Sequence, residues 1–152
     1  MKALDVKVKY LHPLWQEHPL HYATRFSAGA DLRACLQEGR TGIPPGERLA
    51  VGTGLAIEIV TPGMAGFVFS RSGLGTKTGL VVSQGVGVID PDYRGEIVVS
   101  LLNTSRSVQE IVYGQRIAQL IFMPAQQARI LPVAELEPSD RGEGGFGHTG
   151  TV

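Results

Sequence analysis

Short stretches of alternating apolar and polar residues run through the N-terminal half of the chain. Residues 4–10 place Leu, Val, Val and Tyr at every second position, and residues 55–59 repeat this pattern with Leu and Ile. Because side chains alternate between the two faces of a strand, each stretch predicts a strand with one buried face. Residues 97–102 are almost continuously apolar, which predicts a strand buried on both faces.

Glycine and proline divide the chain into pieces that are too short for long helices. The sequence holds 20 Gly and 9 Pro, and no stretch keeps a helical period beyond a few turns. Strands are predicted at residues 4–10, 30–36, 55–59, 65–70, 80–83, 86–89, 96–102, 108–112, 116–123 and 128–133. Residues 11–27 are predicted to be irregular, residues 43–47 a turn, and residues 72–77 a single helical turn. Such a pattern indicates an all-β sandwich, jelly roll or barrel with little helix.

The composition is that of one globular domain without an evident charged binding surface. The chain has 152 residues, of which 43% are hydrophobic and 18% charged. Lys and Arg together equal Asp and Glu at 14 each, which argues against a general nucleic-acid-binding or membrane-binding surface. Cys35 is the only cysteine, so an intrachain disulfide is excluded. The sequence has no secretion signal and no apolar run of membrane-spanning length, so we expect a cytoplasmic protein.

Residues 85–97 combine two apolar runs with the turn sequence Asp-Pro-Asp-Tyr-Arg-Gly between them. Proline and glycine on either side of two acids are typical of a turn between strands, so the pattern predicts a β-hairpin. Asp90 ends the first apolar run. A carboxylate held there by a rigid turn either caps the turn or serves as a positioned base, and this stretch alone favours the cap.

Three further stretches carry polar groups that need a partner. Arg71, Ser72 and Gly73 follow an apolar run, and a guanidinium, a hydroxyl and free backbone amides at a helix start could bind an anion. The alternative is an ordinary capped turn. Asp31 opens a predicted strand, and Gln119 shares a strand face with isoleucines. A polar group on such a face requires a protein or ligand partner.

The last fourteen residues differ from the rest of the chain. They are rich in glycine and almost lack apolar side chains, which is typical of a mobile chain end. Arg141 and Phe146 stand among these glycines and could supply a phosphate-binding fork and a stacking ring on a flexible lid. The alternative is a disordered end. We therefore predict a single β domain over residues 1–138 and a flexible arm over residues 139–152 that closes over a site.

Taken together, five stretches resemble the five motifs of the homotrimeric dUTPase family in their usual order. They are residues 28–34, 71–77, 85–97, 116–122 and 141–150. The resemblance covers most of the chain and implies a distorted jelly-roll or β-clip-like barrel of short strands, with at most one short helix. It also implies Mg²⁺-dependent hydrolysis of dUTP to dUMP and pyrophosphate by attack of water on the α-phosphorus. In this family one site draws on three subunits of a homotrimer.

The resemblance assigns deoxyuridine to residues 85–97. Backbone groups of Val88, Ile89, Asp90 and Val98 would form hydrogen bonds with the polar edge of uracil. The tight fit would leave no room for the methyl group of thymine, and the donor and acceptor pattern of cytosine would not match. Tyr93 would pack on the deoxyribose and exclude a 2′-hydroxyl. Asp90 would be the general base that activates the attacking water.

The resemblance assigns the triphosphate to the other motifs. The residues expected to bind it are Arg71, Ser72, Gly73 and Gln119. Mg²⁺ would be held mainly by phosphate oxygens and water, with Asp31 acting through these waters and no direct protein ligand. The arm would close with Phe146 over the uracil and Arg141 on the terminal phosphates, which excludes bulk water.

The sequence departs from the family pattern at two positions. Gln84 stands where the family usually has an Asn that touches uracil, and Ser70 replaces the Pro that commonly precedes the Arg-Ser pair. Two other functions share this pattern in part. The related dCTP deaminases have the same fold but a different C-terminal segment, and a nucleotide-binding β-trimer without catalysis would lack the base or the arm.

Overall fold

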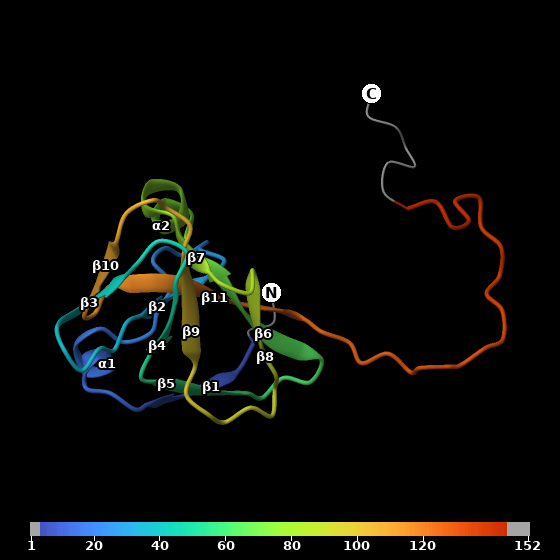
Figure 1. The fold of residues 1–152 in the computed structure, drawn as a ribbon. Coiled ribbons are helices and arrows are strands. Elements are labelled where there is room, and N and C mark those ends of the chain that lie inside the picture. The colour runs from blue at the N-terminus through green and yellow to red at the C-terminus, as the bar shows by residue number, and fades with distance from the viewer. Residues whose placement is uncertain (1–3, 146–152) are drawn as a thin grey trace.

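The computed structural model describes residues 4–145 (Figure 1). Within that range it contains eleven short strands and two short helices. The elements in chain order are β1 (Val6–Tyr10), α1 (Leu14–Glu17), β2 (Ala30–Arg33), β3 (Arg40–Ile43), β4 (Arg48–Gly52), β5 (Leu55–Ile59), β6 (Met64–Ser70), α2 (Ser72–Thr78), β7 (Leu80–Val82), β8 (Val86–Ile89), β9 (Val98–Asn103), β10 (Gln109–Val112) and β11 (Arg116–Pro124). Neither of these helices has the length and apolar character needed to cross a membrane.

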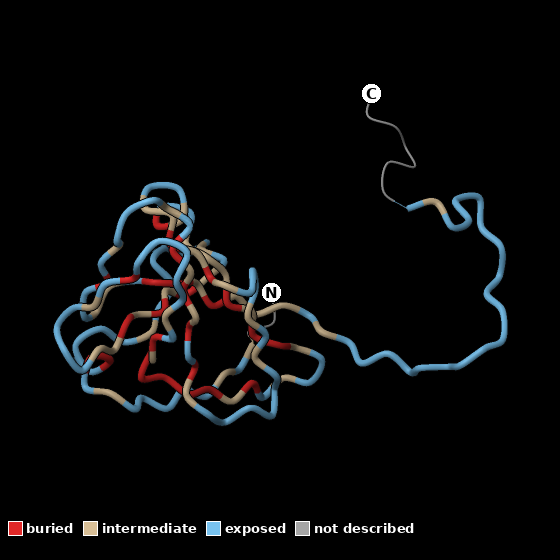
Figure 2. The backbone as a smooth tube through the Cα atoms, viewed as in Figure 1, coloured by how far each residue is buried: buried red, intermediate tan, exposed pale blue. Residues whose placement is uncertain are grey.

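The strands form four antiparallel sheets around one core. The largest has the order β2-β11-β6-β8, the second β4-β9-β7, and the pairs β1-β5 and β3-β10 complete the barrel. Figure 2 shows the buried positions along the strands on the inside of this arrangement. Large aliphatic side chains from different sheets meet there, among them Leu32, Leu55, Leu101 and Leu120, all fully buried. The predicted all-β class of fold is therefore confirmed.

The N-terminal segment is anchored by a tryptophan. Trp15 in α1 is 1% exposed, and its indole N–H donates a hydrogen bond of 2.6 Å to the carbonyl of Thr53. The ring of Tyr10 stacks on that of Trp15 with centroids 6.1 Å apart. The prediction of irregular structure for residues 11–27 missed α1, because this single turn is held by the burial of Trp15 and has no helical period of its own.

The structure contains more helix than the sequence predicted. The expectation of at most one short helix is wrong, since α1 and α2 are both present. The single turn predicted at residues 72–77 extends to Thr78. It ends at Gly79, whose φ of 75° is the left-handed conformation common after a helix.

The strand predictions differ from the structure at four places. Residues 40–43 and 48–52 form strands that were not predicted, and their partners β10 and β9 are far away in the sequence. Residues 128–133 form no strand and are exposed, although they are apolar enough to pair. In β9, Val99 and Leu101 are buried while Val98 is 52% exposed, so a single chain buries only one face of this strand.

The predicted β-hairpin at residues 85–97 is also wrong, and the difference creates a cavity. β8 pairs with β6, whereas β9 pairs with β4 and β7. The two arms therefore enter different sheets and do not pair with each other among the described residues. We call residues 85–97 the arch. Its turn is closed by a backbone hydrogen bond of 3.1 Å from the Tyr93 N–H to the Asp90 carbonyl.

Candidate active site

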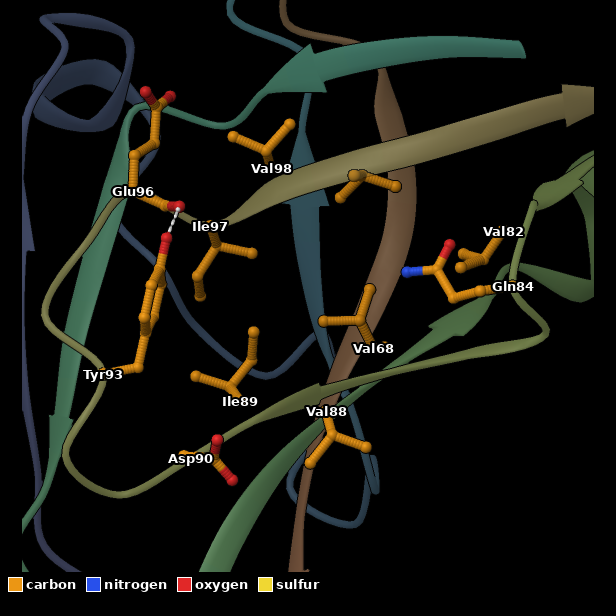
Figure 3. Close-up of a pocket in the computed structure, with 12 residues that line it drawn as sticks. Val68, Val82, Gln84, Val88, Ile89, Asp90, Tyr93, Glu96, Ile97 and Val98 are labelled. Atoms are coloured by element: carbon orange, nitrogen blue, oxygen red, sulfur yellow. Dashed lines mark hydrogen bonds between the residues drawn. The ribbon is translucent and has the colours of Figure 1, made fainter.

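The arch encloses a cavity of about 250 Å³, which we call the arch pocket (Figure 3). Its walls are mostly aliphatic and include Ile97, Val68 of β6, Val82 of β7 and Val99 of β9. Six residues that the sequence predicted to bind substrate line it: Gln84, Val88, Ile89, Asp90, Tyr93 and Val98. A small apolar pocket with a few polar groups is suited to a planar ring with a polar edge.

Backbone groups at the rim of the pocket lie on open strand edges. β8 is the last strand of its sheet, so one of its edges has no partner strand in the described part of the chain. Val98 pairs with Gly52 of β4 on one side, and the register of β7 begins only at Leu101 on the other. Such edges offer hydrogen-bond donors and acceptors to a ligand, as in the binding of an added strand.

Asp90 stands at the rim of the pocket with its carboxylate available. The residue is exposed, and among residues 4–145 its side chain forms no hydrogen bond and no ion pair. The Asp90 carbonyl, not the carboxylate, closes the turn. The structure therefore does not support the turn cap that the isolated stretch favoured.

Tyr93 is held over the turn by its neighbours. Its hydroxyl donates a hydrogen bond of 2.9 Å to the carbonyl of Glu96, which is the dashed line in Figure 3. The ring covers Gly95 so closely that a Cβ there would collide with the phenol. Gly95 was not predicted as a functional residue, although glycine in the Tyr-Arg-Gly turn was a signal for it.

Gln84 presents its amide to the pocket. The hydroxyl of Ser83 donates to Gln84 Oε1 at 3.0 Å, and Figure 3 shows the amide nitrogen directed into the cavity. A Cβ added to Gly87 would lie 3.4 Å from that nitrogen and 3.3 Å from Val68. Gly87 thus lies in close contact with both Val68 and the Gln84 amide.

A second group of predicted residues surrounds Asp31, and we call it the arginine cluster. Arg71 Nε donates to Asp31 Oδ1 at 2.8 Å, and Arg116 Nη1 donates to Oδ2 at 3.0 Å. The Asp31 and Arg71 side chains are only 18% and 23% exposed. Asp31 also faces Gln119 in the register of β2 with β11. Sequence reasoning missed Arg116, although this arginine opens one of the five motifs.

The arginine cluster is suited to bind an anion. Two guanidinium groups against one carboxylate leave one positive charge, and the carboxylate fixes the direction of both guanidinium groups. Arg71 is the N-cap of α2, so Ser72 and Gly73 lie in the first helical turn, and both residues are exposed. Among the described residues no group of three His, Cys, Asp or Glu side chains could hold a metal ion.

None of Asp31, Arg71 and Arg116 lines the arch pocket of the same chain. β6 connects the two groups, because Val68 lines the pocket and Arg71 directly follows the end of the strand. Ser70, the last residue of β6, accepts a hydrogen bond of 2.8 Å from the N–H of Val82, which also lines the pocket. The structure of one chain therefore places the pocket and the cluster near each other without merging them into one cavity.

The comparison with known proteins identifies the family. The dUTPase family profile matches residues 16–150. The chain belongs to the dUTPase family. It is 49% identical over 152 residues to the deoxyuridine 5′-triphosphate nucleotidohydrolase of Citrobacter koseri, covering 99% of this chain and 98% of that protein.

Solved structures of dUTPases share the fold. A variant of the Staphylococcus bacteriophage 80alpha dUTPase with dUpNHpp superimposes with a TM-score of 0.83 at 26% identity, covering 96% of this chain and 98% of that one. A variant dUTPase from phage phi11 of S. aureus, described with a structural Mg(II) ion, gives a TM-score of 0.75 at 22% identity, covering 88% of this chain and 99% of that one. The barrel expected from the resemblance to dUTPases is thus confirmed.

The arm expected from the dUTPase motifs is described in part. β11 ends at Pro124, and the chain then leaves the barrel as an exposed segment (Figures 1 and 2). Arg141 lies in this segment, where its Nε donates a hydrogen bond of 2.8 Å to the carbonyl of Gly144. It touches neither the arch pocket nor the arginine cluster. Phe146 lies outside the described residues.

Proposed function

We propose that the chain hydrolyses dUTP to dUMP and pyrophosphate, with deoxyuridine bound in the arch pocket. The observation that carries the proposal is a free carboxylate, that of Asp90, at the rim of an apolar pocket of about 250 Å³. The full-length similarity to the Citrobacter koseri nucleotidohydrolase supports the same reaction. In a cell this reaction keeps uracil out of DNA and supplies dUMP for thymidylate synthesis.

Uracil is recognised by its polar edge. The open strand edges at Val88, Ile89 and Val98 supply backbone donors and acceptors, and the Gln84 amide adds one more group directed into the pocket. Cytosine exchanges a carbonyl for an amino group at this edge, and a buried mismatch of this kind is strongly rejected. Aliphatic walls against the ring leave no space for the methyl group of thymine.

Tyr93 selects the sugar. Its ring forms the side of the pocket next to Glu96, fixed by the hydrogen bond of the phenol and by the close approach over Gly95. A deoxyribose packs against this ring. A ribose would place its 2′-hydroxyl against the ring, where it would lose its water without gaining a partner.

Asp90 is the general base. Its carboxylate takes a proton from a water molecule, the water oxygen forms a bond to the α-phosphorus, and the bond from that phosphorus to the bridging oxygen breaks. The electron pair leaves with pyrophosphate. The lack of a protein partner for the carboxylate supports this role, because a carboxylate already engaged in a turn is a weaker base.

The complete site is formed by three subunits of a homotrimer. Arg71, Ser72, Gly73 and Gln119 of a second subunit bind the triphosphate, and the arm of residues 139–152 of a third closes over it, with Phe146 on the uracil and Arg141 on the terminal phosphates. The absence of Asp31, Arg71 and Arg116 from the lining of the arch pocket in one chain supports this sharing. So do the exposed apolar side chains Ile130, Leu131 and Val133, which lack a cover in a single chain.

Mg²⁺ fits a site in which the substrate supplies most ligands. Asp31 is the acid beside the triphosphate residues, and both of its oxygens accept hydrogen bonds from arginines. Each carboxylate oxygen has a second lone pair, so Asp31 can also accept a hydrogen bond from a metal-bound water. The ion would be held by phosphate oxygens and water, and it would neutralise charge on the triphosphate.

The proposal is tested by measuring pyrophosphate release from dUTP, dTTP, dCTP and UTP, with Mg²⁺ and with a chelator. We expect release from dUTP only, and a strong decrease when Mg²⁺ is removed. Ammonia is measured in the dCTP reaction to detect deamination. Equal rates on all four nucleotides would refute base and sugar selection by the arch pocket, and ammonia from dCTP would refute the reaction itself.

A further inference from the structure

One acidic side chain of the arch pocket has no part in the chemistry described so far. Glu96 lies where the arch enters β9, next to Tyr93 and Asp90 in the pocket lining. Figure 3 shows its carbonyl facing the Tyr93 hydroxyl and its carboxylate directed away from the pocket. The carboxylate must therefore act on something behind the pocket wall.

The partner of the carboxylate is a turn 42 residues earlier in the chain. Glu96 Oε1 accepts a hydrogen bond of 2.6 Å from the backbone N–H of Gly54, in the turn between β4 and β5. Gly54 has a φ of 63°, and a Cβ there would lie 2.5 Å from His12 Cβ and 2.9 Å from Cys35 Sγ. A side chain at this position is therefore excluded by both conformation and packing.

This turn is one of the most firmly held parts of the barrel. Thr53 is fully buried, and its carbonyl accepts hydrogen bonds from the Trp15 indole at 2.6 Å and from the Cys35 thiol at 3.1 Å. The Thr53 hydroxyl donates to the carbonyl of Ile97 at 2.6 Å. The N–H of Ile97 in turn donates to the carbonyl of Leu55 at 2.8 Å. Residue 97 is thus bound to the turn through its backbone, and residue 96 through its side chain.

The same residue 96 holds Tyr93. The phenol donates to the Glu96 carbonyl at 2.9 Å, so the position of the ring depends on where that carbonyl lies. A continuous chain of contacts leads from the turn at Gly54, through the Glu96 side chain and backbone, to the ring of Tyr93. The carboxylate fixes the carbonyl without occupying any of the space that the sugar needs.

We propose that Glu96 is a positioning residue, and that its bond to Gly54 sets how strongly Tyr93 discriminates deoxyribose from ribose. The inference rests on the proposed function, in which Tyr93 is the sugar filter. Without the bond, the carbonyl of residue 96 is free to shift and the ring follows it. The space for a 2′-hydroxyl then opens.

The test compares kcat/KM for dUTP and for UTP in Glu96→Ala, Glu96→Gln and the control Glu110→Ala, an exposed glutamate that pairs with Arg40 on the distant β3-β10 sheet. We expect the dUTP-to-UTP ratio to fall about tenfold in Glu96→Ala, since one hydrogen bond to a charged group is lost. The fall comes mainly from a lower KM for UTP. In Glu96→Gln the side-chain oxygen still accepts from Gly54, so the ratio is largely restored.

A second variant separates positioning from a general effect on stability. Tyr93→Phe removes the hydrogen bond to the Glu96 carbonyl but keeps the ring, and it should lower the same ratio. Combined with Glu96→Ala it should add little, because both changes break one connection. If Glu96→Ala fails to fold, Tyr93→Phe still tests whether the bond to the Glu96 carbonyl positions the ring. A ratio unchanged in Tyr93→Phe or in Glu96→Ala would overturn the positioning role in an active enzyme, whereas no dUTP hydrolysis by the unmodified chain would overturn the proposed function.

Discussion

Asp90 and Asp92 are two acids of one turn with different surroundings. Asp90 lines the arch pocket, whereas Asp92 does not line it. Both are exposed. The two acids therefore differ in their position relative to the pocket, and a substitution of Asp92 is a suitable control for the same substitution of Asp90.

Asp90→Asn is expected to lower kcat for dUTP by about a thousandfold, because an amide cannot accept the proton of the attacking water. Binding of a non-hydrolysable dUTP analogue should persist, since the two side chains have nearly the same size. Steady-state kinetics and calorimetric titration check these two statements. Asp92→Asn should have kinetics close to those of the unmodified chain. Retained turnover in Asp90→Asn would remove Asp90 as the base.

Local sequence signals singled out two residues that line the arch pocket. Asp90 could be picked out because an acid interrupts an apolar run, and Tyr93 because it stands in the same turn. Glu96 could not be interpreted from the sequence. Its partner is the backbone of Gly54, and a backbone N–H leaves no signature in the amino-acid type of a residue so far away.

At the scale of elements, the turn between β4 and β5 joins the N-terminal segment to the arch. Cys35 lies against this turn, donating to the Thr53 carbonyl, with the Glu96 carboxylate nearby. Burial, and next the charge of Glu96, raise the pKa of the Cys35 thiol from 9.0 to about 11. The thiol therefore reports on the charge behind the pocket wall.

Glu96→Gln is expected to lower the pKa of Cys35, because it removes the negative charge that opposes formation of the thiolate. The pKa should stay above 9.0, since burial is the larger cause and is unchanged. Ultraviolet absorbance of the thiolate, followed as the pH is raised, measures this value. Glu110→Gln should leave it unaltered. An unchanged Cys35 pKa in Glu96→Gln would show that the Glu96 carboxylate does not act on the thiol.

Strands were predicted where apolar and polar residues alternate clearly, but the sequence did not predict which strands pair with each other. β1 and β5 alternate clearly and were found, while β3 has a single buried apolar residue, Ile43, and exists through its pairing with β10. In the arch, the local sequence predicted a pairing that does not form. Its sequence is that of a hairpin, yet each arm has a better partner in another sheet, and the pocket is the space left between the arms.

The whole molecule raises a question that a single barrel does not answer, namely how the proposed base-binding and phosphate-binding groups meet. The five motifs predicted one site, but a sequence cannot tell whether motifs unite within a chain or between chains. In one barrel the arginine cluster does not line the arch pocket. In the proposed homotrimer, contact between copies of the chain would bring the two groups together, and such sharing can be measured.

The proposed sharing of a site between subunits can be measured with trimers that contain two different variants. Asp90→Asn removes the base and Arg71→Ala removes a triphosphate ligand, so each variant alone should be nearly inactive. If one site takes Asp90 from one subunit and Arg71 from the next, every trimer that contains both variants has one intact site. The variants are co-expressed with different affinity tags and purified through both, which keeps only such trimers. About a third of the sites then have both residues, so about a third of the unmodified activity should return, compared with each variant prepared alone. If each chain instead carried its own complete site, every site in the mixture would hold one defect, and no activity would return.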